Sequence, residues 1–376
     1  DIFDAMGAVW GHQYGLEVAN YFAEGEEPRH ETPSFRRSNA WAATAREVRA
    51  VREGVGINEV QNFGKYRVTG RDARAWLDRV MAGRIPAQGR LSLTPMLSER
   101  GRIIGDFTVS CLSETEFQLT ASYAAQDYHL RWFDKQLSGD VQVENLSDRR
   151  TGFQIAGPRA RDLLQATTQA DVTGMRFLDV RRLTIGTVEA LVQRVSFTGD
   201  LGYEIYVDAM DQRALWQVLW DKGQAFGIKP FGMRAMMSLR LDRGFGAWMR
   251  EYAPDYTPAE TGLDRFVAWS KAADFIGRGA VQAERTTPPA RRLAQFVVDA
   301  EDADVVAYEP IWLDGAVAGF CTSGGYSHWT GQSVAMGFLP AERIADGLGV
   351  EIEILGRMRP ARVVTGPLWN DPRMRA

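Results

Sequence analysis

The chain has 376 residues, and its 44 Lys and Arg against 48 Asp and Glu give a formal net charge of −4. Hydrophobic residues make up 45% and charged residues 24%, which excludes a disordered chain and a nucleic-acid binder that depends on bulk positive charge. The length predicts two or three domains, because single cores stop growing beyond about 250–300 residues.

The N-terminal part is expected to change from irregular to regular structure. In the first 45 residues Pro28 and Pro33 interrupt any long helix, so an irregular arm is expected, followed by a helix over about 42–52. The pattern then predicts strands at 65–69, 103–111 and 117–120 and helices at 73–81 and 123–137. This order of elements indicates a compact α+β domain.

A second block begins at about residue 151. Gly157 and Pro158 form a turn that starts a helix, because proline is favoured at the first helical position. The block is expected to contain strands at 152–156, 182–185, 190–197 and 203–207 and helices around 160–167 and 215–219. From about residue 291 short alternating runs predict a small sandwich or barrel, with strands at 295–298, 311–313, 317–321, 334–338, 350–355 and 361–364.

Several classes of cofactor and compartment are disfavoured. There is no dinucleotide fingerprint, phosphate-binding loop or nucleophile elbow, so an oxidation by this polypeptide alone is not expected. The histidines lack the spacing of a helical metal site, and the two distant cysteines, Cys111 and Cys321, exclude a disulfide framework and fit the reducing cytoplasm. No apolar run approaches the roughly 18 residues of a membrane span, so no membrane partner is expected.

Three carboxylates occur in unusual surroundings. Asp106 lies in the apolar run GRIIGDFTV (101–109). If its role is only structural, its carboxylate is expected to accept hydrogen bonds from backbone N–H groups. Glu204 alternates with Tyr203 and Ile205, so it shares a face with Tyr206 and by default faces solvent. Glu260, in TPAETGL (257–263), serves equally well as a helix cap or an ion-pair partner.

Together these segments resemble the aminomethyltransferase, or glycine-cleavage T-protein, family. The motifs that carry the resemblance are GDFTV (105–109), GP (157–158), TGDLGYE (198–204), SLRLD (238–242), TPAETGL (257–263) and VAMGF (334–338). The similarity is greatest to the folate-binding C-terminal half of dimethylglycine and sarcosine dehydrogenases and oxidases. That branch is indicated by ETPSFRRS (31–38), VREGVG (51–56), RAMMSLR (234–240), ADFIGR (273–278) and SGGYSH (323–328).

The resemblance implies an α+β fold of three domains arranged as a cloverleaf. The folate-binding first domain would comprise residues 1–60 and 150–275. A ferredoxin-like α+β domain over 61–149 would be inserted into it, and a β-barrel or jelly-roll domain would occupy 276–376.

The resemblance also implies site residues. Asp106 matches the carboxylate beside the folate nitrogens that accept a one-carbon unit, and Glu204 matches the residue that binds the pterin. The other folate-binding positions implied are Tyr206, Ser122 in place of an asparagine, Tyr123, Arg234 and Trp369. Met236 replaces an arginine of the glycine-cleavage enzymes, whereas Arg234 fits the dehydrogenase-like branch. Tyr326 and His328 are expected to reach the substrate or to play a structural part in their loop.

The function implied is one-carbon transfer to tetrahydrofolate from a small methylated amine, giving 5,10-methylene-tetrahydrofolate. This leaves room for a flavin- or metal-containing oxidising domain or subunit, since the chain begins at Asp1 rather than Met and lacks a flavin fingerprint. One alternative is a stand-alone demethylase that moves an intact methyl group from an N-, O- or S-methylated molecule to N5. A second is a folate-binding regulatory protein without catalysis.

Overall fold

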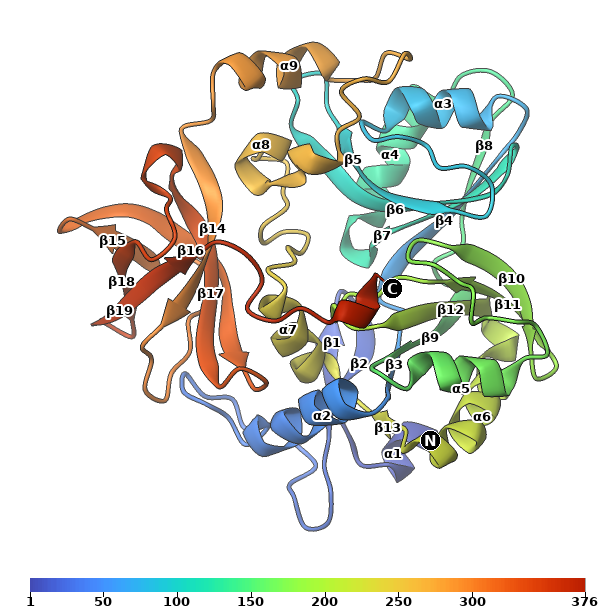
Figure 1. Ribbon diagram of the computed structural model, residues 1–376, viewed down its shortest axis with the longest axis horizontal. Helices are drawn as coiled ribbons and strands as arrows, with labels where there is room; N and C mark the ends of the chain where they lie inside the picture. The colour runs from blue at the N-terminus through green and yellow to red at the C-terminus, as the bar shows by residue number, and fades with distance from the viewer. Residues whose placement is uncertain (376) are drawn as a thin grey trace.

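The computed structural model, which describes residues 1–375, has three β-rich lobes, with helix α7 (Met233–Asp242) near the middle of the view and helix α2 (Trp41–Glu53) below it (Figure 1). The two helices pack against each other in a shared hydrophobic cluster. Each lobe has its own hydrophobic core. The three cores agree with the domain number expected from the chain length.

The first lobe is built on a six-stranded sheet of order β10-β11-β12-β9-β3-β13. Its strands are β3 (Gly56–Glu59), β9 (Arg150–Ala156), β10 (Val180–Ile185), β11 (Val188–Gln193), β12 (Gly202–Asp208) and β13 (Lys229–Pro230). The helices α5 (Ala160–Thr167) and α6 (Gln212–Gly223) contribute to the core on one face. In β12 this core takes Tyr203, Ile205 and Val207, so Glu204 and Tyr206 project from the other face.

The strand expected over 190–197 ends earlier than predicted, at Gln193. The Arg194 N–H still donates to the carbonyl of Asp179, the residue just before β10, but the Val195 N–H donates to the carbonyl of Gln193, two residues earlier. The chain therefore turns away from the sheet at Val195, although Val195 and Phe197 continue the apolar alternation.

The second lobe lies in sequence between β3 and β9. Its sheet has the order β5-β6-β7-β4-β8 and comprises β4 (Phe63–Thr69), β5 (Leu91–Leu97), β6 (Ile103–Ser113), β7 (Glu116–Ser122) and β8 (Gln142–Asn145). The helices are α3 (Ala73–Val80) and α4 (Gln126–Gln136). Both helices were expected from the sequence, and α3 was expected from its apolar periodicity. Trp76, Leu77 and Phe133 pack into the core that these helices share with the sheet.

The C-terminal lobe is a closed barrel of order β14-β17-β16-β15-β18-β19. Its strands are β14 (Arg291–Val298), β15 (Pro310–Leu313), β16 (Ala316–Ser327), β17 (Gln332–Pro340), β18 (Gly349–Ile354) and β19 (Arg357–Val364). The short helix α8 (Pro258–Thr261) and helix α9 (Arg278–Thr286) precede it in the chain. The sequence left a sandwich or a barrel open, and the structure confirms the barrel.

The expectation of an irregular N-terminal arm is wrong for residues 8–22. After the short helix α1 (Ile2–Ala5), the strands β1 (Ala8–Gln13) and β2 (Leu16–Phe22) form an antiparallel hairpin. Tyr14 (φ 55°) and Gly15 (φ 85°) both adopt the left-handed conformation that a two-residue hairpin turn requires. The helix-breaking prolines act only after the hairpin.

A buried ion cluster joins helices α2 and α7 to the segment that precedes β12 in the first lobe. Arg52 of α2 lies 2.7 Å from both Asp200 and Asp242, and all three side chains are almost fully inaccessible. The ring of Trp369 lies 3.5 Å from the Arg52 guanidinium. The cluster connects four separate segments of the chain, because Asp242 belongs to α7 and Trp369 follows the barrel.

Candidate functional site

A cavity of about 260 Å³ lies where the first two sheets meet α7. We call it the carboxylate cavity, because Asp106 of β6 and Glu204 of β12 both line it. Most of its wall is apolar, with aromatic side chains from Phe63, Phe107, Phe177, Phe197, Phe245, Trp248, Tyr252 and Phe266. A mostly apolar pocket with a few polar groups is typical of small-molecule sites.

Asp106 lies on β6 opposite Pro95 of β5 and is partly accessible. Burial raises the pKa of its carboxyl to about 6, with only its own backbone N–H acting in the opposite direction. Within residues 1–375 no other side chain forms a hydrogen bond or ion pair with it. The expectation of an aspartate satisfied by backbone N–H groups is therefore wrong, since only its own backbone N–H acts on it. Asp106 is a carboxyl of raised pKa that faces a cavity without a neutralising partner.

The position before Asp106 is constrained to be small. A Cβ at Gly105 would lie 2.5 Å from Nε2 of His129, which is fully buried and bonded to the Ile104 carbonyl and to Tyr66. Glycine therefore lets β6 approach α4 closely.

Glu204 is only 6% exposed, so the default expectation of a solvent-facing glutamate is wrong. One carboxylate oxygen accepts a hydrogen bond of 2.8 Å from the Tyr206 hydroxyl. Burial raises the pKa of Glu204 to about 7, although Tyr206 and the positive charge of Lys65 both act to lower it. Lys65 is itself buried, and burial lowers its pKa to about 7. The site thus holds ionisable groups that change charge near neutral pH.

The structure separates the other candidates into different places. Ser122 lines the carboxylate cavity with Asp106 and Glu204. Tyr206 is not in the lining, but its hydroxyl donates a hydrogen bond to the Glu204 carboxylate. Tyr123 does not line it, since its hydroxyl donates to Asp148 at 2.9 Å. Trp369 does not line it either, because its ring packs on Arg52 and against Trp329.

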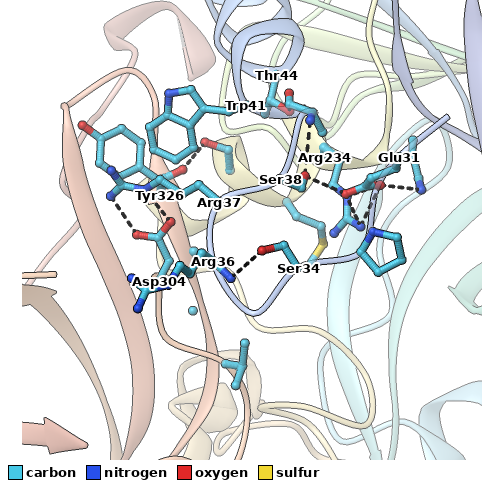
Figure 2. Close-up of a pocket in the computed structure, with 18 of the residues that line it drawn as sticks. Glu31, Ser34, Arg36, Arg37, Ser38, Trp41, Thr44, Arg234, Asp304 and Tyr326 are labelled. Atoms are coloured by element: carbon cyan, nitrogen blue, oxygen red, sulfur yellow. Dashed lines mark hydrogen bonds and ion pairs between the residues drawn. The ribbon is translucent and has the colours of Figure 1, made fainter. Parts of the chain in front are cut away.

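Arg234, Tyr326 and His328 lie in a second, larger opening of about 890 Å³ on another side of α7 (Figure 2). We call it the arginine groove, after Arg29, Arg36, Arg37 and Arg234 in its lining. Its arginines are largely paired with carboxylates. Arg234 lies 2.9 Å from Glu31, and Arg37 makes two hydrogen bonds of 3.2 Å to Asp304.

An aromatic cluster forms one side of the arginine groove. The Arg37 guanidinium lies 4.1 Å from the Trp41 ring centroid and 4.6 Å from that of Tyr326. The His328 ring lies 4.4 Å from Trp41, and burial lowers the pKa of His328 to about 4. The aromatic side chains of this cluster are therefore already packed against one another and against Arg37. Within residues 1–375, Met237 of α7 is the one residue that lines both openings.

Glu260 has the structural role that the sequence allowed. It forms a capping box with Thr257 at the start of α8 and ion pairs with Arg102 and Arg291. Two further polar residues of the carboxylate cavity, Asn58 and Gln154, were missed by the sequence analysis. Alternation along strand 152–156 places Gln154 on the face opposite Phe153 and Ile155, and this signal was available.

Two negative findings apply to residues 1–375. No group of three or more His, Cys, Asp or Glu side chains is arranged to hold a metal ion. None of the helices in this range combines the length and the apolar character that crossing a bilayer requires.

Comparison with known proteins gives the same result in sequence and in structure. The model of the GCVT N-terminal domain matches residues 1–271, and that of the glycine cleavage T-protein C-terminal barrel domain matches residues 291–370. Mitochondrial dimethylglycine dehydrogenase of Mus musculus is 35% identical over 363 residues, which cover 95% of this chain and 42% of that protein. The chain thus spans less than half the length of this relative.

Two further relatives match over nearly their whole length. The aminomethyltransferase of Bacillus subtilis (strain 168) is 28% identical over 333 residues, covering 88% of this chain and 92% of that protein. The crystal structure of glycine cleavage system aminomethyltransferase T from Bartonella henselae superposes with a TM-score of 0.85 at 21% identity, covering 98% and 96% of the two chains. This superposition confirms the expected three-domain α+β fold. On these matches, the chain belongs to the aminomethyltransferase, or glycine-cleavage T-protein, family.

Proposed function

We propose that this chain catalyses tetrahydrofolate-dependent one-carbon transfer. It accepts a one-carbon unit derived from a methylated amine of the dimethylglycine or sarcosine type, and the product is 5,10-methylene-tetrahydrofolate. The observation that supports this most directly is the presence of Asp106 and Glu204 in one mostly apolar cavity. Both carboxyls have raised pKa values, which is typical of functional sites.

The residues present fit a reduced pterin. Its pyrimidine edge offers two adjacent N–H donors, which the ionised Glu204 can accept side by side as charge-assisted hydrogen bonds. Aromatic and methionine side chains such as Phe197, Phe245 and Met236 provide apolar walls for a flat ring. The unpartnered Oε1 of Gln154 is a further buried acceptor at this wall.

The chain's own residues have separable roles in this proposal. Reduced folate supplies the nucleophilic nitrogens that take up the carbon. Glu204 orients the bound molecule, and the apolar walls exclude water. Asp106, with its pKa near 6, is ionised at neutral pH and can accept and return a proton at the reacting nitrogen. Its negative charge also stabilises positive charge that develops during transfer.

The proposed partner is a domain or subunit that oxidises the methylated amine with a flavin or a metal. This chain covers 42% of a relative named as a dehydrogenase, so more than half of that relative has no counterpart here. The two free cysteines are both buried, which is compatible with the proposed location in the reducing cytoplasm.

A test uses Asp106→Asn with Asp134→Asn as the matched control, because Asp134 is an exposed carboxylate in the same lobe. We expect Asp106→Asn to lower turnover by about 10²- to 10⁴-fold while folate affinity changes little. The control is expected to keep both. Turnover of Asp106→Asn equal to that of the parent protein would refute the assignment.

Product analysis separates the proposal from its alternatives. The protein is incubated with tetrahydrofolate and dimethylglycine, with and without an added oxidising flavoenzyme, and the folate is identified by mass. Methylene-tetrahydrofolate that forms only with the oxidising enzyme, and faster than in the same mixture without this protein, supports the proposal, because free formaldehyde also condenses with tetrahydrofolate uncatalysed. 5-Methyl-tetrahydrofolate formed without the oxidising enzyme would indicate a stand-alone demethylase. Binding without either product would indicate a regulatory folate-binding protein.

A further inference from the structure

Four polar residues form a continuous row across the floor of the first sheet. Gln193 of β11 pairs with Glu204 of β12, Glu204 pairs with Gln154 of β9, and Gln154 pairs with Asn58 of β3. Their exposed fractions are 0% for Gln193, 6% for Glu204, 3% for Gln154 and 7% for Asn58. A buried row of this kind is costly unless its polar groups have partners.

The hydrogen bonds within the row determine which atom of Gln154 is free. The Phe231 carbonyl can only accept, so Asn58 presents its Nδ2 to it at 2.6 Å and turns its Oδ1 towards Gln154. Gln154 in turn donates from Nε2 to this Oδ1 at 3.2 Å. The amide orientation is thereby set, and Oε1 of Gln154 is left as a buried acceptor without a partner in the described chain.

The two glutamines beside Glu204 differ in one respect. Gln154 lines the carboxylate cavity, together with Asn58 and Glu204. Gln193 is not among the lining residues, although both its Oε1 and its Nε2 also lack partners. Since a buried acceptor left without a donor is destabilising, a ligand in the cavity that brings an N–H to Gln154 regains that hydrogen bond.

We propose that Gln154 is a specificity-determining residue, whose Oε1 accepts a hydrogen bond from the exocyclic 2-amino group of the pterin beside Glu204. The inference rests on the proposed folate-dependent function. Glu204 takes the ring N–H and one amino hydrogen, and the second amino hydrogen remains for Gln154. Directly paired residues on neighbouring strands stand about 4.5–5.5 Å apart at Cβ, close enough for both side chains to reach one amino group.

The test measures binding of tetrahydrofolate and of its 2-desamino-2-methyl analogue by titration calorimetry. The variant is Gln154→Met, which keeps the side-chain volume and removes the acceptor. The matched control is Gln193→Met, which changes the same residue type on the other side of Glu204 but away from the cavity. Thermal melting of both variants checks that they fold.

We expect Gln154→Met to weaken tetrahydrofolate binding about 5- to 10-fold, the worth of one hydrogen bond, and to leave binding of the analogue unchanged. Gln193→Met is expected to change neither by more than about twofold. Asn58→Leu is a second variant, which releases the amide orientation of Gln154. It is expected to weaken tetrahydrofolate binding but not analogue binding.

Equal losses for both ligands, or no loss for tetrahydrofolate in either the Gln154 or the Asn58 variant, would overturn the inference while leaving the proposed function intact. Failure of the parent protein to bind tetrahydrofolate at all would instead overturn the proposed function, and the inference with it. The parent measurement therefore distinguishes the two failures.

Discussion

The affinity for tetrahydrofolate is predicted to fall as the pH drops through about 7, because Glu204 must be ionised to accept two N–H donors. Burial places the pKa of Glu204 at about 7. For a single group whose ionised form binds, the dissociation constant scales as 1 + 10^(7−pH), which is about 11 at pH 6 and about 1.1 at pH 8. Affinity is thus fully present well above pH 7 and about tenfold weaker at pH 6.

The measurement is calorimetric titration with tetrahydrofolate at several pH values and in buffers of different ionisation enthalpy. At pH 7 the free protein carries about half a proton on Glu204, so binding should release about 0.5 proton. Glu204→Gln should bind weakly and remove this release, which also controls for titration of the folate itself.

Lys65 provides a second check on the same reasoning. Its charge lowers the pKa of Glu204, so Lys65→Met should raise that pKa and move the midpoint of the binding curve to higher pH. A binding curve that is flat between pH 6 and 8, or that has the same shape in Glu204→Gln, would refute the role assigned to Glu204.

Three further outcomes are expected. Turnover should fall tenfold per pH unit below about pH 6, where Asp106 becomes protonated, and a pH–rate profile with an unchanged plateau down to pH 5 would contradict this. Arg52→Met should destabilise the fold by about 3–5 kcal/mol by leaving two buried aspartates unpaired. Burial raises the pKa of both Asp200 and Asp242, so the deficit should shrink as the pH falls and grow as it rises, as a comparison of thermal melting at pH 5 and pH 8 would show. Gly152→Ala should lower the free energy of unfolding by about 1–3 kcal/mol in chemical denaturation, because the added Cβ would lie 1.8 Å from the Ile205 carbonyl oxygen. Unchanged stability would contradict the register of β9 and β12.

Local patterns were sufficient for most of the regular elements. The helices over 73–81 and 160–167 and strand 203–207 have a single apolar face, and periodicity depends only on neighbouring residues. The N-terminal hairpin was missed because its turn uses Tyr14, a residue that rarely takes the left-handed conformation. The strand expected over 190–197 ends at Gln193, because the Val195 N–H bonds locally to the Gln193 carbonyl, and the apolar alternation of Val195 and Phe197 does not show this turn.

The candidate site was only partly predictable, because its contacts also depend on segments that are distant in the sequence. Motifs pointed to Asp106 and Glu204, and both line one cavity. The same approach grouped Trp369 and Arg234 with them, although the structure places Trp369 on Arg52 and Arg234 beside Glu31. A motif records that a residue recurs in a family, but the partner it touches depends on segments more than a hundred residues away.

The sequence by itself determined the family and, through it, the three-domain fold, and it singled out Asp106 and Glu204 as candidates, because motifs and their order can be read along the chain. Only the tertiary structure decided that Glu204 is buried, since residues of the second lobe lie beside it: Lys65 acts on its charge, and Phe63 and Thr120 line the same cavity. That burial raises its pKa and leaves Gln154 with a free acceptor in the same row. Desolvation is a property of what surrounds a side chain, and in this fold the surroundings come from distant segments of the chain.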